Sequence, residues 1–281
     1  LQRDRILGSM LIDAHVHVHP EKNGMGERHD ATLDNLLRRM DLARLDKAVL
    51  LPIAADVPYI KHCPNNFIGA CTAQHSDRLI GFASVHPMDP DAPQKLEHDV
   101  YTYGLQGLKL HPRFQGMAVS DPRVYPLIEK ALDLDLPIIV DCLLWKPTPL
   151  AMQLPFHIDV LCKQYPNVRI IMAHAGGFRF LDALAVIVAN DNVYLDISVS
   201  LLYFQNTPFE DQFMFVLKQA GSHRLIYGSD HPQYDLVETL SSSRSLLQKH
   251  GFTEEDLCFI YCRTFQSLLP GASTRHKQHG I

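Results

Sequence analysis

The stretch LIDAHVHV, residues 11–18, decides the fold of this chain. An apolar run of this length is typical of a strand buried on both faces, as in a parallel sheet. Side chains alternate along a strand, so His15 and His17 point to the same side. Two imidazoles that converge in this way can share one divalent ion. The alternative is a pair of core or surface histidines without a ligand.

Similar apolar runs recur along the rest of the chain. They lie at 48–54, 79–85, 107–112, 137–142, 168–174, 193–198 and 224–230. Segments with helical periodicity separate many of them, at 31–46, 121–135, 178–190, 208–220, 235–249 and 253–269. Asp121-Pro122 is typical of a helix start, and Thr253 with Asp256 is close to a capping box.

Eight strand–helix units predict an α/β fold, a single-domain (β/α)8 TIM barrel. An open doubly wound sheet is the alternative, but no glycine-rich phosphate loop follows the first run. We expect the barrel to span 10–270, with a polar tail at 271–281. Gly8-Ser9-Met10 resembles a cloning scar, so residues 1–9 are left out of the fold argument.

Composition excludes several classes of function. The 281 residues carry a net charge of −5 and a pI near 6.3, which does not favour binding to nucleic acid or an anionic membrane. No run of about 18 apolar residues predicts a membrane span. The six cysteines show no disulfide framework, which favours a cytoplasmic location.

Polar residues gather at the predicted strand ends. The carboxyl ends of barrel strands line one mouth, where barrel enzymes place their active sites. Burying many polar groups there costs stability unless they pair or bind something. We therefore predict a catalytic site from these residues: Asp13, His15, His17, His86, Lys109, His111, Asp141, His174, Asp196, Ser198, Asp230 and His231.

Four motifs together resemble the amidohydrolase superfamily, in its amidohydrolase-related branch. They are DAHVH at 13–17, GLKLHP at 107–112, AHAGG at 173–177 and YGSDHP at 227–232. That branch includes metal-dependent hydrolases, aminocarboxymuconate-semialdehyde-type decarboxylases and 2-pyrone-4,6-dicarboxylate lactonase-type enzymes. The resemblance covers residues 11–270, and its motifs are specific for the fold rather than for one substrate.

The resemblance implies roles for four residues. His15 and His17 match metal ligands, and Asp230 matches a carboxylate that binds metal or moves a proton. His174 matches a histidine that orients water or contacts the substrate. The expected cofactor is a divalent ion, with zinc favoured, manganese as an alternative, and a metal-free enzyme as a further alternative.

Asp141 departs from the pattern, because many relatives carry histidine there. It could ligate the metal through oxygen, with a preference for harder ions, or serve as a partner of Lys109. Lys109 could be a carbamylated bridging ligand, a substrate-carboxylate contact or part of an ion pair with Asp141 or Asp196. We favour charge recognition or an ion pair.

Substrate contacts are expected from Lys109, His111, Arg113 and Trp145. Arg113 begins a loop and could bind a carboxylate through two hydrogen bonds, or be a solvated surface side chain. Trp145 could form a wall of the pocket or pack within a surface loop.

We therefore expect a metal-dependent hydrolase acting on a small, acidic lactone, ester or amide through an activated water. The alternatives are a non-oxidative carboxy-lyase and a metal-independent lactonase on the same barrel. A non-catalytic binding protein is a third class, which the retained His15, His17, His174 and Asp230 argue against. The expected partner is a small molecule, and a homo-oligomer is compatible with this type of barrel.

Overall fold

The computed structural model describes residues 10–53, 60–144 and 148–272. Eight short parallel strands coincide with the eight apolar runs of the sequence, and the second begins one residue before its run, at Lys47. They are β1 (Ile12–Val16), β2 (Lys47–Leu50), β3 (Leu79–Gly81), β4 (Leu108–Leu110), β5 (Ile138–Val140), β6 (Ile170–Met172), β7 (Val193–Asp196) and β8 (Leu225–Ile226).

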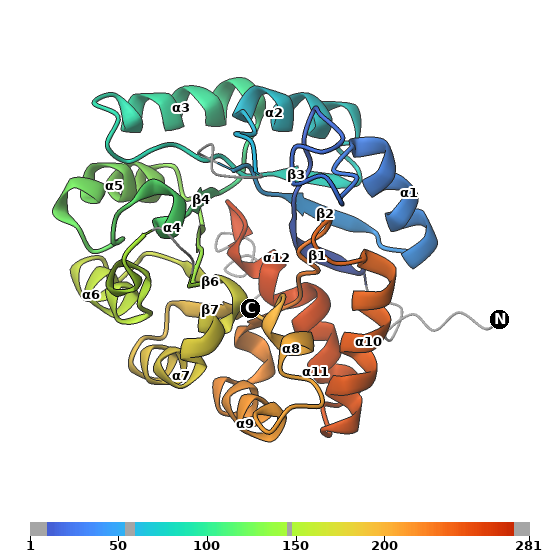
Figure 1. Ribbon diagram of the computed structural model, residues 1–281. Helices are drawn as coiled ribbons and strands as arrows, with labels where there is room; N and C mark the ends of the chain where they lie inside the picture. The colour runs from blue at the N-terminus through green and yellow to red at the C-terminus, as the bar shows by residue number, and fades with distance from the viewer. Residues whose placement is uncertain (1–9, 54–59, 145–147, 273–281) are drawn as a thin grey trace, which may run out of the picture.

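The strands close into a ring. Within it, β1, β2 and β3 pair in one sheet and β4 to β8 pair in order in another. A bridge between Ala83 and Leu108 joins β3 to β4, and a bridge between Val16 and His231 joins β1 to the segment after β8. The Ala14 amide also donates to the Tyr227 carbonyl at 3.0 Å. The predicted single-domain (β/α)8 barrel is therefore confirmed, and Figure 1 shows its helices around the strands.

Helices connect successive strands, and further helices follow the last strand. They are α1 (Leu33–Ala43), α2 (Asn65–Gln74), α3 (Ala92–Tyr103), α4 (Pro112–Gln115), α5 (Tyr125–Asp133), α6 (Phe156–Gln164), α7 (Phe180–Ala189), α8 (Ser200–Tyr203), α9 (Glu210–Ala220), α10 (Leu236–Lys249), α11 (Glu254–Cys258) and α12 (Thr264–Leu268). Both predicted caps are present: Asp121 accepts from the Arg123 amide, and Thr253 forms a capping box with Asp256. The six helical patterns of the sequence thus correspond to real helices.

One predicted helix, at 253–269, is interrupted by a π-helical turn over Phe259–Arg263 that separates α11 from α12. In this turn the Ile260 carbonyl accepts a hydrogen bond from the Tyr227 amide at 2.9 Å. The wide turn therefore supports the short strand β8 from the helix side.

Two apolar clusters form the core. The larger one lies between the strands and the surrounding helices. The smaller one joins alternate strand residues to α12, which Figure 1 draws at the centre of the ring. Its buried members are Ile12, Ala14, Val49, Leu51, Ile80, Phe82, Ile139, Ile171, Ala173, Ile226, Cys262, Phe265 and Leu268. This inner packing fills one end of the barrel and leaves the carboxyl ends of the strands for polar groups.

Among the described residues, no helix is both long enough and apolar enough to cross a membrane.

Candidate active site

The strand ends bring a set of ionisable side chains together out of solvent. Each of them is at most 9 % exposed: His15, His17, Lys109, His111, Asp141, His174, Asp196 and Asp230. Groups of this kind are stable in a protein interior only when they pair with one another or bind a ligand.

His15 in β1 and His17 just after it each turn Nε2 toward the carboxylate of Asp230. His15 Nδ1 lies 2.5 Å from Asp196 Oδ2, and His17 Nδ1 lies 2.7 Å from the Leu51 carbonyl oxygen. Carboxylate and carbonyl oxygens accept hydrogen bonds, so each Nδ1 carries a proton, and Nε2 is the nitrogen that faces Asp230. Burial, followed by the nearby Lys109, holds the pKa of His15 well below its ordinary value.

Asp230 is the carboxylate that both Nε2 atoms face. Its Oδ1 lies 3.5 Å from His15 Nε2 and 3.3 Å from His17 Nε2. Burial alone would raise the pKa of Asp230, but the hydrogen-bonded His17 and the other imidazoles outweigh it and bring the pKa to about 2. The side chain is therefore ionised at neutral pH.

Backbone strain accumulates around these residues. Asp230 has φ of 60°, His174 has 58° and Val199 has 60°, all in the left-handed region that residues with a Cβ rarely adopt. Each such residue costs on the order of 1–3 kcal/mol and persists where the surrounding structure imposes it, which is characteristic of functional sites.

Asp13 does not join the group formed by His15, His17 and Asp230. The pairing register of β1 shifts between Asp13 and Val16, so regular alternation does not extend along the whole strand. Asp13 Oδ1 instead accepts hydrogen bonds from the His15 amide at 3.1 Å and the Ser229 amide at 2.9 Å. Burial raises its pKa to about 7. Asp13 thereby fixes β1 against the segment that carries Asp230.

His174 is held at both ring nitrogens. Nδ1 lies 2.9 Å from Ser198 Oγ, and Nε2 lies 3.3 Å from Asp141 Oδ1. The Ser198 hydroxyl donates to Asp196 Oδ2 at 2.9 Å, the same oxygen that receives His15 Nδ1. A continuous polar chain thus links the two imidazoles through the end of β7.

Asp141 contacts a basic side chain through each of its oxygens. Arg113 Nε lies 2.5 Å from Asp141 Oδ2, and His174 faces its other oxygen. Burial opposes ionisation of Asp141, but Arg113 and His174 hold its pKa well below the ordinary value. Lys109 has no carboxylate within ion-pairing distance among the described residues, and its Nζ lies 3.5 Å from His15 Nε2. Burial lowers the pKa of Lys109.

The donor set fits a divalent ion. The Nε2 atoms of His15 and His17 face the carboxylate of Asp230, and a divalent cation held among these three groups would satisfy them together. Potential ligand atoms of His15, His174 and Asp230 also lie within 4.8 Å of one another. Among the predicted ligands, His17 and Asp141 lie outside that three-residue group, whereas His174 is an additional candidate ligand.

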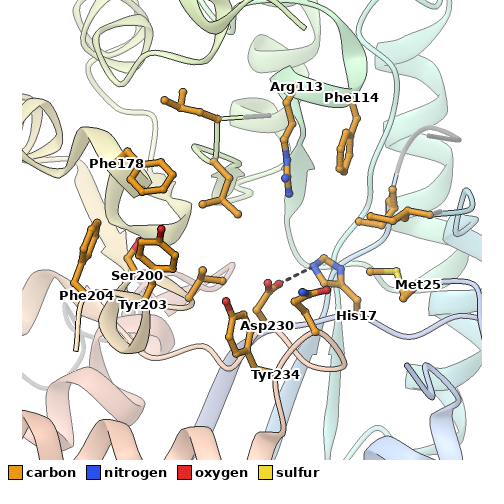
Figure 2. A pocket seen from close by; sticks show the side chains of 17 residues that line it. His17, Met25, Arg113, Phe114, Phe178, Ser200, Tyr203, Phe204, Asp230 and Tyr234 are labelled. Carbon is orange, nitrogen blue, oxygen red and sulfur yellow. Dashed lines mark ion pairs between the residues drawn. The ribbon is translucent and has the colours of Figure 1, made fainter. Parts of the chain in front are cut away.

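A cavity of about 310 Å³ opens above this cluster. His17 and Asp230 lie at its floor and Arg113 projects into it from the opposite side, as Figure 2 shows. Most of the wall is apolar or aromatic: Met25, Ile53, Ile60, Phe114, Leu143, Leu144, Gly177, Phe178, Val199, Tyr203, Phe204 and Tyr234. A small molecule could therefore reach Asp230 through this opening.

The predicted substrate contacts differ in whether they line the cavity. Arg113 lines the cavity, whereas Lys109 and His111 are buried beside it and do not line it. The His111 ring stacks on Phe114 at 5.4 Å between centroids. Trp145 lies outside the described residues.

Sequence reasoning missed the contribution of Phe114 and Tyr234 to the cavity wall. Phe114 directly follows Arg113, and Tyr234 follows Asp230 by four residues in the loop after β8. Their positions shortly after the ends of β4 and β8 were the available signal, because the segments that follow the strands surround the mouth of a barrel.

The amidohydrolase family model matches residues 12–247 of the chain. The chain belongs to the amidohydrolase family. The match covers all eight strands and every predicted site residue. A search of curated proteins returned no match.

Solved structures share this amidohydrolase barrel at low sequence identity. An uncharacterised TIM-barrel protein from Bordetella bronchiseptica has a TM-score of 0.76 and 15% identity, covering 92% of this chain and 98% of that one. A probable 2-pyrone-4,6-dicarboxylic acid hydrolase from Acinetobacter baumannii, with citric acid bound, has a TM-score of 0.67 and 18% identity, with coverages of 92% and 99%. A 5-carboxyvanillate decarboxylase from Novosphingobium aromaticivorans, with bound manganese, has a TM-score of 0.70 and 12% identity, with coverages of 93% and 97%. Such similarity supports the fold.

Proposed function

We propose that this amidohydrolase is a metal-dependent hydrolase acting on a small, acidic lactone, ester or amide. The observation that carries the proposal is the convergence of two imidazole nitrogens, His15 Nε2 and His17 Nε2, on Asp230 Oδ1 at 3.5 and 3.3 Å. Zinc suits a site of two histidines and one carboxylate, and manganese is the alternative.

Each residue has a defined part in the proposed reaction. When bound, the ion would supply Lewis acidity that lowers the pKa of water toward about 7. Asp230 accepts a proton from the attacking water and returns it to the leaving oxygen or nitrogen. His174, held by Ser198 and Asp141, faces the same region and stabilises the charge that develops on the substrate oxygen.

A metal-free hydrolysis is the alternative at this site. Asp230 would then activate water directly as the general base. Both reactions use the same residues, and a requirement for the ion distinguishes them.

A carboxy-lyase is the second candidate. Its support is the aromatic lining of the cavity, which includes Phe114, Phe178 and Tyr234 and suits a planar ring acid. The manganese-containing decarboxylase neighbour shows that the same fold accommodates this reaction. In this case Asp230 or His174 would deliver a proton to the ring carbon that loses CO₂.

Product analysis tests the proposal. The zinc- or manganese-supplemented protein is incubated with small aryl lactones, esters and amides and with hydroxybenzoates, while acid release and CO₂ release are measured separately. We expect hydrolysis without CO₂, reduced about 10²- to 10⁴-fold in Asp230→Asn. CO₂ release would favour the lyase, and turnover that survives Asp230→Asn would contradict both mechanisms.

A further inference from the structure

The position where the family resemblance leads us to expect a histidine ligand holds an acid that contacts a guanidinium and an imidazole. Asp141 is 2 % exposed and follows β5 directly. One of its oxygens faces Arg113 Nε at 2.5 Å, and the other faces His174 Nε2 at 3.3 Å. Both carboxylate oxygens are thus engaged by neighbours from the adjoining strand ends.

Arg113 contacts Asp141 and Phe114 on one side and faces the cavity on the other. Its Nε contacts Asp141, and its guanidinium carbon lies 4.3 Å from the centroid of the Phe114 ring. Because the closest contact to Asp141 is through Nε, the terminal nitrogens extend beyond the pair, and Figure 2 shows the guanidinium pointing toward Asp230 and His17. A guanidinium fixed in this way is prepared to bind a carboxylate through two hydrogen bonds.

We infer that Asp141 is a positioning residue rather than a metal ligand, and that it anchors Arg113 as the receptor for the carboxylate of a planar, ring-containing substrate. The inference rests on the proposed function, since it names the substrate class of the same site. The ring would lie against the aromatic wall of Phe114, Tyr203 and Tyr234, with its charge on Arg113.

Benzoate and its neutral analogue benzamide probe the receptor directly by calorimetry. We expect the protein to prefer benzoate, and Arg113→Gln to weaken benzoate binding about 10- to 100-fold while leaving benzamide unchanged. Arg123→Gln is the matched control, because Arg123 is exposed and pairs with Asp121 outside the cavity. Benzoate affinity that survives Arg113→Gln would overturn the assignment of the receptor.

Asp141→Asn tests the anchor. We expect benzoate to bind roughly 2- to 10-fold more weakly, because the freed guanidinium must be ordered by the ligand. The same change in an Arg113→Gln background should have no effect. Tighter benzoate binding in Asp141→Asn would show that Asp141 competes for the guanidinium and would overturn the anchoring role.

Metal content separates the two roles of Asp141. We expect Asp141→Asn to keep the metal of the parent protein, whereas loss comparable to that of His15→Ala would make Asp141 a ligand and overturn the inference. Because the binding assay needs no turnover, a protein that binds benzoate through Arg113 but hydrolyses nothing would contradict the proposed function alone.

Discussion

The protonation state of Asp13 affects the stability of the barrel. It is fully buried, accepts the His15 and Ser229 amides, and has a pKa raised to about 7 by burial. In the unfolded chain its pKa is near 3.8. The unfolded state therefore loses its proton first as pH rises, so this residue lowers the free energy of unfolding between about pH 4 and pH 7, with no further change above that range.

Asp13→Asn should remove this dependence and retain an acceptor for both amides. We expect the variant to gain stability relative to the parent protein as pH rises from 4 to 7, measured by urea unfolding at several pH values. Asp13→Ala leaves two buried amides without this acceptor and should cost about 1–3 kcal/mol for each. A stability difference between Asp13→Asn and parent that does not vary with pH would contradict the account.

The residues nearest the chemistry were the most predictable. His15, His17, His174 and Asp230 stand at strand ends, where the pattern of apolar runs alone places polar side chains at the barrel mouth. The ion pair of Asp141 was not predictable, because its partner Arg113 lies in the single-turn helix α4, which is too short to show helical periodicity. From sequence, Lys109 or a metal was the expected partner.

Close approach of strands makes Gly228 a critical position just after β8. A Cβ built there would lie 2.6 Å from His15 Cβ and 2.9 Å from Asp196 Oδ1. Gly228→Ala should therefore displace His15 and cost about 1–3 kcal/mol of stability. Thermal unfolding and metal content together measure this, with both expected to fall.

Gly251→Ala provides the matched control. Gly251 has φ of +85° but nothing within 4 Å of the added Cβ, so only backbone strain changes. We expect about 1 kcal/mol of destabilisation and full metal content. Metal retention in Gly228→Ala equal to that of the control would show that the packing of His15 does not govern the site.

At the scale of elements, the pattern predicted where strands and helices lie but not their irregularities. The register shift in β1 and the π-helical turn at Phe259–Arg263 change hydrogen bonding without changing which residues are apolar. Both occur where β1 and β8 lie close together, in the backbone segments that carry or support His15 and Asp230. Periodicity reports burial, so it does not reveal such local changes.

At the scale of the whole molecule, apolar packing and the ionisable side chains lie at opposite ends of the barrel. The inner cluster packs against α12 at one end, whereas the buried charges and the left-handed residues His174, Val199 and Asp230 lie at the other. The eight strand–helix units of the sequence predicted this architecture, because a helix must cover each strand. The surface does not follow from such a pattern, so a homo-oligomer stays a prediction, which light scattering in solution would test.

Elemental mass spectrometry of the purified protein, with chelators kept out of its preparation, tests the central claim most directly. The account predicts about one zinc or manganese per chain, retained by the Arg123→Gln control and lost in His15→Ala, since His15 lies among the converging ligands. Less than about a tenth of an equivalent, with no gain when zinc or manganese is added, would contradict a metal-dependent enzyme.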